Sequence, residues 1–189
     1  MPAVSWARRA RESPSPAALR VALIGNPNSG KSTLFNALTG LRQRVANFPG
    51  VTVERIEGGY ACHGASRVVV IDLPGTYSLV AESPDEAIAL EVLNGTAAGM
   101  PPIDVIVVVV DAENLERNLY LATQVLELGR PTVIALSRAD RLAAAGIQVD
   151  VPALIHELGA VVVPVVATRR EGIDRLRHAI ALAPSLPLA

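Results

Sequence analysis

The chain has 189 residues, enough for one domain with a sizeable hydrophobic core. Half of the residues are hydrophobic but only 3% are aromatic, so Val, Ala, Leu and Ile must build that core, which suits parallel strands buried on both faces. The formal charge of −1 provides no basic stripe and argues against a nucleic-acid partner. Cys62 is the only cysteine, which excludes an internal disulfide and a metal site built from cysteines. We interpret Cys62 and His63 as an ordinary pair near a hairpin turn rather than as metal ligands.

Residues 1–18 contain no predicted element. They are rich in Arg, Ser and Pro and have no apolar stretch, which predicts a mobile tail rather than a secretory signal. A short basic segment that touches a membrane through Trp6 is the alternative, supported by three arginines. No apolar run reaches the roughly 18 residues that a membrane span needs, and the run at 105–110 has the length of a strand.

Strand and helix patterns alternate along the rest of the chain. The first half predicts a strand at 20–24, a helix at 33–40 that ends at Gly40, a polar and mobile connection at 41–50, and an antiparallel hairpin at 51–73 that turns near Gly64. A loop follows, and then a helix at 83–93. Ser83 and Glu86 have the spacing of a capping box, and Pro84 suits the first helical position.

The second half repeats strand followed by helix. The predicted elements are a strand at 104–111, a helix at 114–129, a strand at 131–137, a short helix, a helix at 151–159, a strand at 160–167 and a helix at 171–182. This alternation with one early hairpin predicts an α/β fold with a mostly parallel, doubly wound sheet flanked by helices. We expect the ordered domain to span 19–183 and a C-terminal tail to cover 184–189.

The stretch from Gly25 to Ser32 matches G-x-x-x-x-G-K-[ST] and lies between a predicted buried strand and a helix, as a phosphate loop (P-loop) requires. Consecutive backbone N–H groups and the helix N-terminus supply positive potential for phosphates. Lys31 is the only lysine among 17 basic residues, and a compact ammonium is not interchangeable with the planar fork of arginine. We expect it to be exposed, to reach the β- and γ-phosphates and to have little role in folding. The predicted phosphate-side residues are Gly25, Asn26, Pro27, Asn28, Ser29, Gly30, Lys31, Ser32 and Thr33.

The sequence DLPG at 72–75 follows the second strand of the predicted hairpin. Asp72 can hold Mg²⁺ through water, Gly75 can offer its N–H to a γ-phosphate, and the hydroxyls of Ser32 and Thr52 can ligate the Mg²⁺ directly. Thr52 lies in the connection expected to close over the nucleotide. The predicted nucleotide-binding residues of this part are Gly50, Val51, Thr52, Asp72, Leu73, Pro74 and Gly75.

The sequence SRAD at 137–140 stands where many guanine-binding proteins have Asn-Lys-x-Asp. Asp140 can accept hydrogen bonds from guanine, and the stem of Arg138 can stack on the base. Ser137 is shorter than Asn, has fewer hydrogen-bonding groups, and is expected not to span the same gap. A second loop, with Ala167 and Thr168, is expected to meet the guanine carbonyl. We therefore predict weak GDP binding and loose selection of GTP over ATP.

These motifs, in this order, resemble a small GTPase domain. The stretches GNPNSGKSTLFNALTG, QRVANFPGVTVE, DLPGTYSL, SPDE and DAENLERNLYLATQVLELG are similar to the cytoplasmic G domain of the ferrous iron transporter FeoB, over roughly residues 19–182. The stretch NLERNLYL is more specific to that family than the nucleotide motifs are. The resemblance implies a P-loop NTPase fold and GTP hydrolysis with Mg²⁺, and it places the domain on the cytoplasmic side of the cell membrane. The implied partners are the helical regulatory domain and the membrane domain of a full-length transporter.

The resemblance also implies residue roles. Asn28 would bind K⁺ beside the phosphates, together with backbone carbonyls near Ala46 and Phe48, where the family usually has Gly and Trp. Asn28, Lys31, Thr52 and Gly75 would form the catalytic group. Thr76 stands where other GTPases have a water-orienting Gln.

Two functions from different classes remain open. The first is a GTP-hydrolysing switch coupled to a transporter, and the second is a nucleotide-gated binding module with negligible turnover. A P-loop small-molecule kinase is disfavoured, because the chain has Thr52 and DxPG and no evident lid. No His, Cys or carboxylate cluster has the spacing of a ferrous site, and the sequence does not predict an oligomeric state.

Overall fold

The computed structural model describes residues 18–41, 43–62, 65–81 and 83–186. The predicted tail at 1–17, His63 and the last three residues of the predicted C-terminal tail lie outside them. Within the described ranges, no helix is long and apolar enough to cross a membrane.

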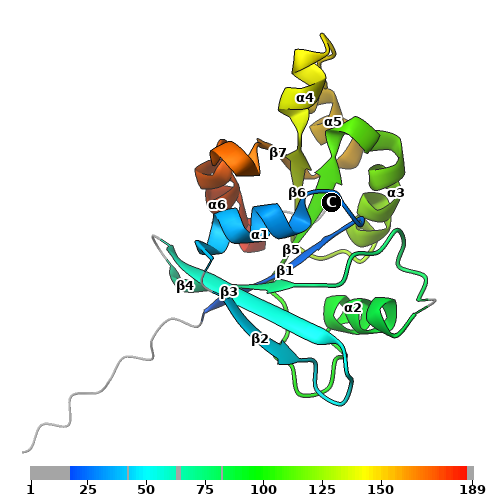
Figure 1. The fold of residues 1–189 in the computed structure, drawn as a ribbon, viewed down its shortest axis with the longest axis vertical. Coiled ribbons are helices and arrows are strands. Elements are labelled where there is room, and N and C mark those ends of the chain that lie inside the picture. The colour runs from blue at the N-terminus through cyan, green and yellow to red at the C-terminus, as the bar shows by residue number, and fades with distance from the viewer. Residues whose placement is uncertain (1–17, 42, 63–64, 82, 187–189) are drawn as a thin grey trace, which may run out of the picture.

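The core of the fold is a seven-stranded sheet with strand order β2-β3-β4-β1-β5-β6-β7 (Figure 1). Its strands are β1 (Leu19–Gly25), β2 (Gln43–Asn47), β3 (Glu54–Cys62), β4 (Ala65–Asp72), β5 (Val105–Asp111), β6 (Thr132–Ser137) and β7 (Val161–Val165). Strand β3 is antiparallel to both of its neighbours, and the other pairs are parallel. The mostly parallel sheet with one antiparallel hairpin strand is therefore confirmed.

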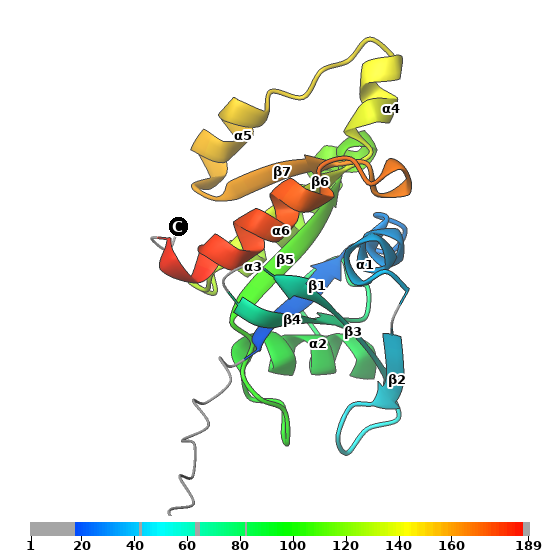
Figure 2. The same cartoon turned by 90° about the vertical axis from the view of Figure 1, so that its left-hand side faces the viewer.

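Helices cover both faces of the sheet, as a doubly wound fold requires (Figure 2). Helices α1 (Lys31–Thr39) and α6 (Ile173–Leu182) pack on one face through a buried cluster that includes Leu34, Phe35 and Leu176. The opposite face is covered by α2 (Pro84–Asn94), α3 (Leu115–Leu126) and α5 (Val151–Leu158). Strand β5 is buried over its whole length because it lies in the middle of this sandwich.

The predicted polar connection at 41–50 is corrected by the structure. Residues Gln43–Asn47 form β2, which pairs with β3 at the edge of the sheet. All five residues of β2 are exposed, so the sequence lacks the apolar alternation that identifies a half-buried strand. The unpaired backbone groups of β3 provide the hydrogen-bonding partner, and this long-range pairing has no local signature.

Local end signals are confirmed where the structure resolves their geometry. The backbone N–H of Glu86 donates to Ser83 Oγ at 3.2 Å at the start of α2, and Gly40 ends α1 in a left-handed conformation. Short elements complete the chain: the 3-10 turns η1 (Ala112–Asn114), η2 (Ala167–Arg169) and η3 (Ala183–Ser185), and the helix α4 (Ala139–Ala144). Because the carboxyl ends of β1, β4, β5, β6 and β7 share one edge, the loops that follow them meet there.

Candidate nucleotide-binding site

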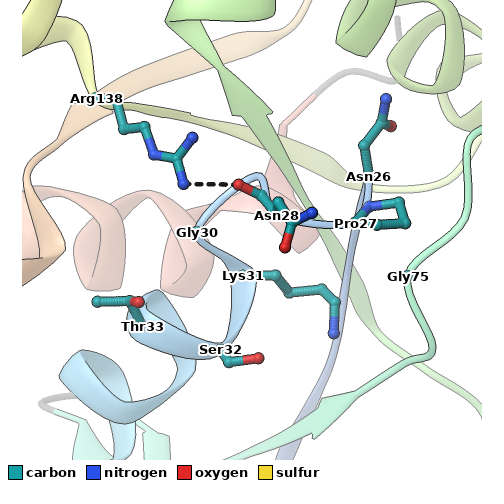
Figure 3. A pocket seen from close by; sticks show the side chains of 9 residues that line it. All are labelled: Asn26, Pro27, Asn28, Gly30, Lys31, Ser32, Thr33, Gly75 and Arg138. Carbon is teal, nitrogen blue, oxygen red and sulfur yellow. Dashed lines mark hydrogen bonds between the residues drawn. The ribbon is translucent and has the colours of Figure 1, made fainter.

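The loop between β1 and α1 surrounds an open pocket of about 430 Å³ (Figure 3). Its lining joins the phosphate loop to the loops after β4 and β6 and consists of Asn26, Pro27, Asn28, Gly30, Lys31, Ser32, Thr33, Gly75 and Arg138. Most of the predicted phosphate-side residues are thus brought together. Gly25 ends β1, and Ser29 is buried beneath the loop.

The backbone of the phosphate loop has the shape that an anion site needs. Asn28 and Gly30 have φ angles of 64° and 93°, and α1 begins at Lys31 immediately after them. The N-terminus of this nine-residue helix has no side-chain cap. Its free N–H groups and the helix dipole therefore face the pocket, where phosphate oxygens can accept their hydrogen bonds.

Lys31 is not a freely exposed lysine, which corrects the expectation that its side chain is exposed. Its Nζ lies 2.6 Å from Asp72 Oδ1, and the two side chains are only 12% and 9% exposed. Burial raises the pKa of the Asp72 carboxyl above its ordinary value, and the Lys31 charge and hydrogen bond oppose that rise. In this structure, Lys31 is therefore the cation that compensates a buried carboxylate.

The loop after β4 approaches the phosphate loop at Gly75. A Cβ atom on Gly75 would lie 3.3 Å from the Pro27 backbone N, so a larger residue would crowd the contact. Leu73 is buried, and its N–H donates to the Leu23 carbonyl at 2.9 Å. These contacts fix the DLPG segment beside the pocket.

The Thr76 hydroxyl is engaged in hydrogen bonds within the protein. Thr76 is 1% exposed, and its Oγ1 lies 2.6 Å from the Ser78 carbonyl and 3.0 Å from Glu86 Oε1. Because those acceptors engage the hydroxyl, it is not free to orient a water.

Thr52 lies apart from the phosphate pocket. It lines a separate open hollow of about 580 Å³ together with Asn47, Phe48, Gly50, Val51, Val53 and Pro84. The predicted Mg²⁺ ligands Ser32 and Asp72 are thus on the phosphate side, while Thr52 lines the other hollow.

A smaller hollow of about 140 Å³ lies where the base is predicted to bind. Its lining includes all the predicted base-side residues: Ser137, Arg138, Asp140, Ala167 and Thr168. Two residues of this region were missed by the sequence analysis: Arg141, which lines the hollow, and Arg169, which pairs with Asp140. Arg169 NH1 lies 3.2 Å from Asp140 Oδ2, and Arg169 also pairs with Glu171 at 2.7 Å. The only available signal was its position in the second base-side loop.

Ser137 does span the gap to the phosphate loop, which corrects the expectation for its shorter side chain. Its Oγ lies 2.7 Å from the Ser29 carbonyl and 3.3 Å from the Val110 carbonyl, and the residue is 6% exposed. The close approach of β6 to the phosphate loop, which no sequence pattern encodes, makes a serine long enough. Ser137 therefore braces the loop.

The guanidinium of Arg138 points toward the phosphate loop, as the dashed line in Figure 3 marks. Its NH1 donates to Asp111 Oδ2 at 2.7 Å, and its NH2 donates to the Asn28 carbonyl at 2.6 Å. Arg138 also lines the base-side hollow, so its stem remains available to a base. Asp111 was missed by the sequence analysis, although it ends a buried strand at the same sheet edge as Asp72.

The donor set fits Mg²⁺ better than a transition metal. Among the described residues, no group of three His, Cys, Asp or Glu side chains could hold a metal. Ser32 and Asp72 offer the oxygen ligands that Mg²⁺ prefers, and such a site is completed by phosphates and water. Asn28 lies on the phosphate pocket, whereas the Phe48 carbonyl accepts a hydrogen bond from Val51 N in the other hollow. The predicted K⁺ ligands Asn28 and Phe48 therefore line different hollows.

The sequence matches a family profile described as "Ferrous iron transport protein B" over residues 19–180. It is 52% identical over 167 residues to the Fe(2+) transporter FeoB of Salmonella typhimurium and 50% identical to that of Escherichia coli (strain K12). Each alignment covers 86% of this chain and 21% of the relative, so the chain spans about a fifth of the length of these relatives.

Solved structures agree with this match. The cytosolic domain of the T. maritima FeoB iron transporter in a GDP form superposes with a TM-score of 0.84 at 38% identity, covering 92% of this chain and 66% of that one. The FeoB G domain from Methanococcus jannaschii gives a TM-score of 0.74 at 41% identity, covering 89% of this chain and 99% of that one.

Proposed function

Because the chain belongs to the ferrous iron transport protein B family as its N-terminal G domain, we propose that it binds and hydrolyses GTP. In this proposal it acts as the nucleotide switch of a ferrous iron transporter. The observation that carries this proposal is the phosphate pocket, in which the N-terminus of α1, Lys31, Ser32 and Gly75 converge. The functional domain covers 19–183. The relative in the GDP form supports a guanine nucleotide as the ligand.

The geometry suggests how the residues act on GTP. Lys31 leaves Asp72 and binds the β- and γ-phosphates when nucleotide binds, and the Asp72 carboxylate would then be free to hold Mg²⁺ through a water. Gly75 donates its N–H to the γ-phosphate, and Thr52 swings in from its separate hollow. Mg²⁺, when bound, supplies positive charge that offsets the charge developing on the phosphate oxygens.

Catalysis at this site needs positive charge between the phosphates. Among the described residues, Lys31 and Arg138 are the cationic side chains that line the phosphate pocket, and Arg138 is held by Asp111 and Asn28. A K⁺ held by Asn28 would supply the additional positive charge, where other systems use an arginine. Backbone groups orient the attacking water, because the Thr76 hydroxyl is engaged elsewhere.

Base selection is relaxed in this proposal. Asp140 provides the guanine-reading carboxylate, but Ser137 directs its hydroxyl to the phosphate loop and offers no amide to a base. GDP binding is accordingly weak and release is fast, and ATP is rejected less strictly than in a site with Asn.

The remaining parts of the transporter are the proposed partners. The chain covers 21% of relatives that are named Fe(2+) transporters. A helical regulatory domain and a membrane domain would receive the nucleotide signal, with this domain on the cytoplasmic side.

The test measures phosphate release by the purified domain with GTP, in KCl and in NaCl at equal ionic strength, together with binding of GTP, GDP and ATP. Turnover that rises with KCl supports the switch, whereas guanine binding without turnover supports the alternative, a nucleotide-gated binding module. Absence of guanine-nucleotide binding would overturn both.

A further inference from the structure

Arg138 connects three parts of the site that are far apart in the sequence. It follows β6, belongs to the base-side loop, and has a left-handed backbone with a φ of 58°. From there its guanidinium reaches Asp111 at the end of β5 and the Asn28 carbonyl in the phosphate loop. The side chain is 30% exposed, although a solvated loop arginine would make neither contact.

The Asp111 end of this connection is firmly held. The carboxylate is 4% exposed, its Oδ1 accepts from Glu113 N at 3.0 Å, and its Oδ2 accepts from Asn114 Nδ2 at 3.1 Å. The backbone N–H of Asp111 donates to Asn118 Oδ1 at 3.2 Å. These hydrogen bonds hold the buried Asp111 carboxylate in place, so it presents a fixed acceptor to Arg138.

At the other end of this connection, the backbone of Asn28 has an uncommon conformation. Asn28 has a φ of 64°, a conformation that residues other than glycine seldom adopt, although Asn tolerates it better than most. Such a conformation persists only when its surroundings impose it. The hydrogen bond from Arg138 NH2 orients the Asn28 carbonyl, and Ser29 N–H closes the adjacent turn on the Asn26 carbonyl at 3.1 Å.

We propose that Arg138 is a positioning residue that is anchored on Asp111 and holds the phosphate loop in its left-handed conformation at Asn28 before nucleotide binds. This inference rests on the proposed function only in that the positioned residue serves nucleotide hydrolysis. It gives a physical reason for arginine at this position. The two terminal nitrogens of a guanidinium can each serve one acceptor in a fixed geometry, whereas a lysine has a single nitrogen for both.

The chain offers a matched pair of substitutions for the test. Arg138→Lys keeps the charge and the aliphatic stem but removes the fork. Arg141→Lys makes the same change one helical turn away, at a side chain that is 62% exposed and contacts Glu113 at 3.2 Å. The first readout is amide hydrogen exchange of Ser29 N–H in the nucleotide-free protein, and the second is the rate of GTP hydrolysis as a function of GTP and KCl concentration.

For Arg138→Lys we expect Ser29 exchange to rise about three- to tenfold, as for the loss of one charge-assisted hydrogen bond. We also expect kcat to fall more than KM changes, and the KCl concentration for half-maximal rate to rise. Arg141→Lys should leave Ser29 exchange unchanged. Asp111→Asn should reproduce the Arg138→Lys exchange effect, and the double variant should add little to it.

Wild-type exchange at Ser29 in Arg138→Lys would overturn the inference, as would equal effects of the two lysine variants. If Asp111→Asn does not fold, the Arg138 and Arg141 comparison decides alone. The exchange readout needs no nucleotide. A wild-type protein without GTP turnover would therefore contradict the proposed function while the positioning role is still tested.

Discussion

Lys31→Ala is expected to abolish tight nucleotide binding and also to destabilise the ligand-free protein. In the structure, Lys31 Nζ lies 2.6 Å from the largely buried Asp72 carboxylate. Removing one partner of a buried pair costs about 3–5 kcal/mol, because the other charge stays uncompensated. Asp72 can escape part of this cost by taking up a proton, since burial already raises its pKa. We therefore expect a loss of about 2 kcal/mol in unfolding free energy at neutral pH.

The pH dependence of this loss has a definite sign. The folded-state pKa of Asp72 is raised above the model-compound value of 3.8, so the ionised carboxylate disfavours the folded state at neutral pH. That penalty declines as pH falls through the raised folded pKa and is lost below 3.8, where the group is protonated in both states. Losing Lys31 removes the charge that lowers this pKa and enlarges the penalty. The stability difference between Lys31→Ala and wild type should therefore shrink as pH falls toward 3.8.

Urea unfolding of wild type and Lys31→Ala, at neutral pH and near pH 4, measures this difference directly. The double variant Lys31→Ala with Asp72→Asn is the control, since removing both charges should restore most of the lost stability. Equal stability of the two proteins at neutral pH would refute the role of the pair. A variant that still bound GTP within a few-fold of wild type would refute the phosphate-loop assignment.

Three further substitutions test other parts of the site and fold. Thr52→Ala should lower the hydrolysis rate about ten- to hundredfold, as for the loss of one contact to a charged group, while GDP affinity changes little. Equal losses of hydrolysis rate and GDP affinity would contradict closure on the γ-phosphate. Ser137→Asn should tighten guanine nucleotides about fivefold or more without tightening ATP, and competition binding that shows parallel gains would exclude a base contact. Gly172→Ala should lower the free energy of unfolding by at least about 2 kcal/mol, because its Cβ would collide with the Pro164 carbonyl oxygen. The control is Gly146→Ala, since Gly146 has the same φ of 77° but a Cβ there would meet no atom within 4 Å. Thermal unfolding of these two variants separates collision from backbone strain, and equal losses would show that strain alone decides.

The features that could be predicted from the sequence are those that depend on residues adjacent in the chain. The phosphate loop could be predicted because its glycines, Lys31 and Ser32 lie in one continuous backbone turn that leads into a helix. The cap at Ser83 is likewise local, and alternating apolar strands and helices were sufficient for a doubly wound sheet. The residues on both sides of the nucleotide pocket could be named because parallel strands bring their carboxyl ends to one edge.

Which of those residues contact one another depends on how separate strands and helices pack. Strand β2 forms because it pairs with the edge of β3, and the exposed residues of β2 show no apolar alternation. Ser137 reaches the phosphate loop, and Arg138 reaches Asp111, across 108 and 27 positions of sequence respectively. Such contacts depend on distances of a few ångströms between separate strands, which side-chain type and spacing along one chain do not specify. The same packing buries Asp72 and thereby makes Lys31, which the sequence presents as a loop residue, the cation that compensates it.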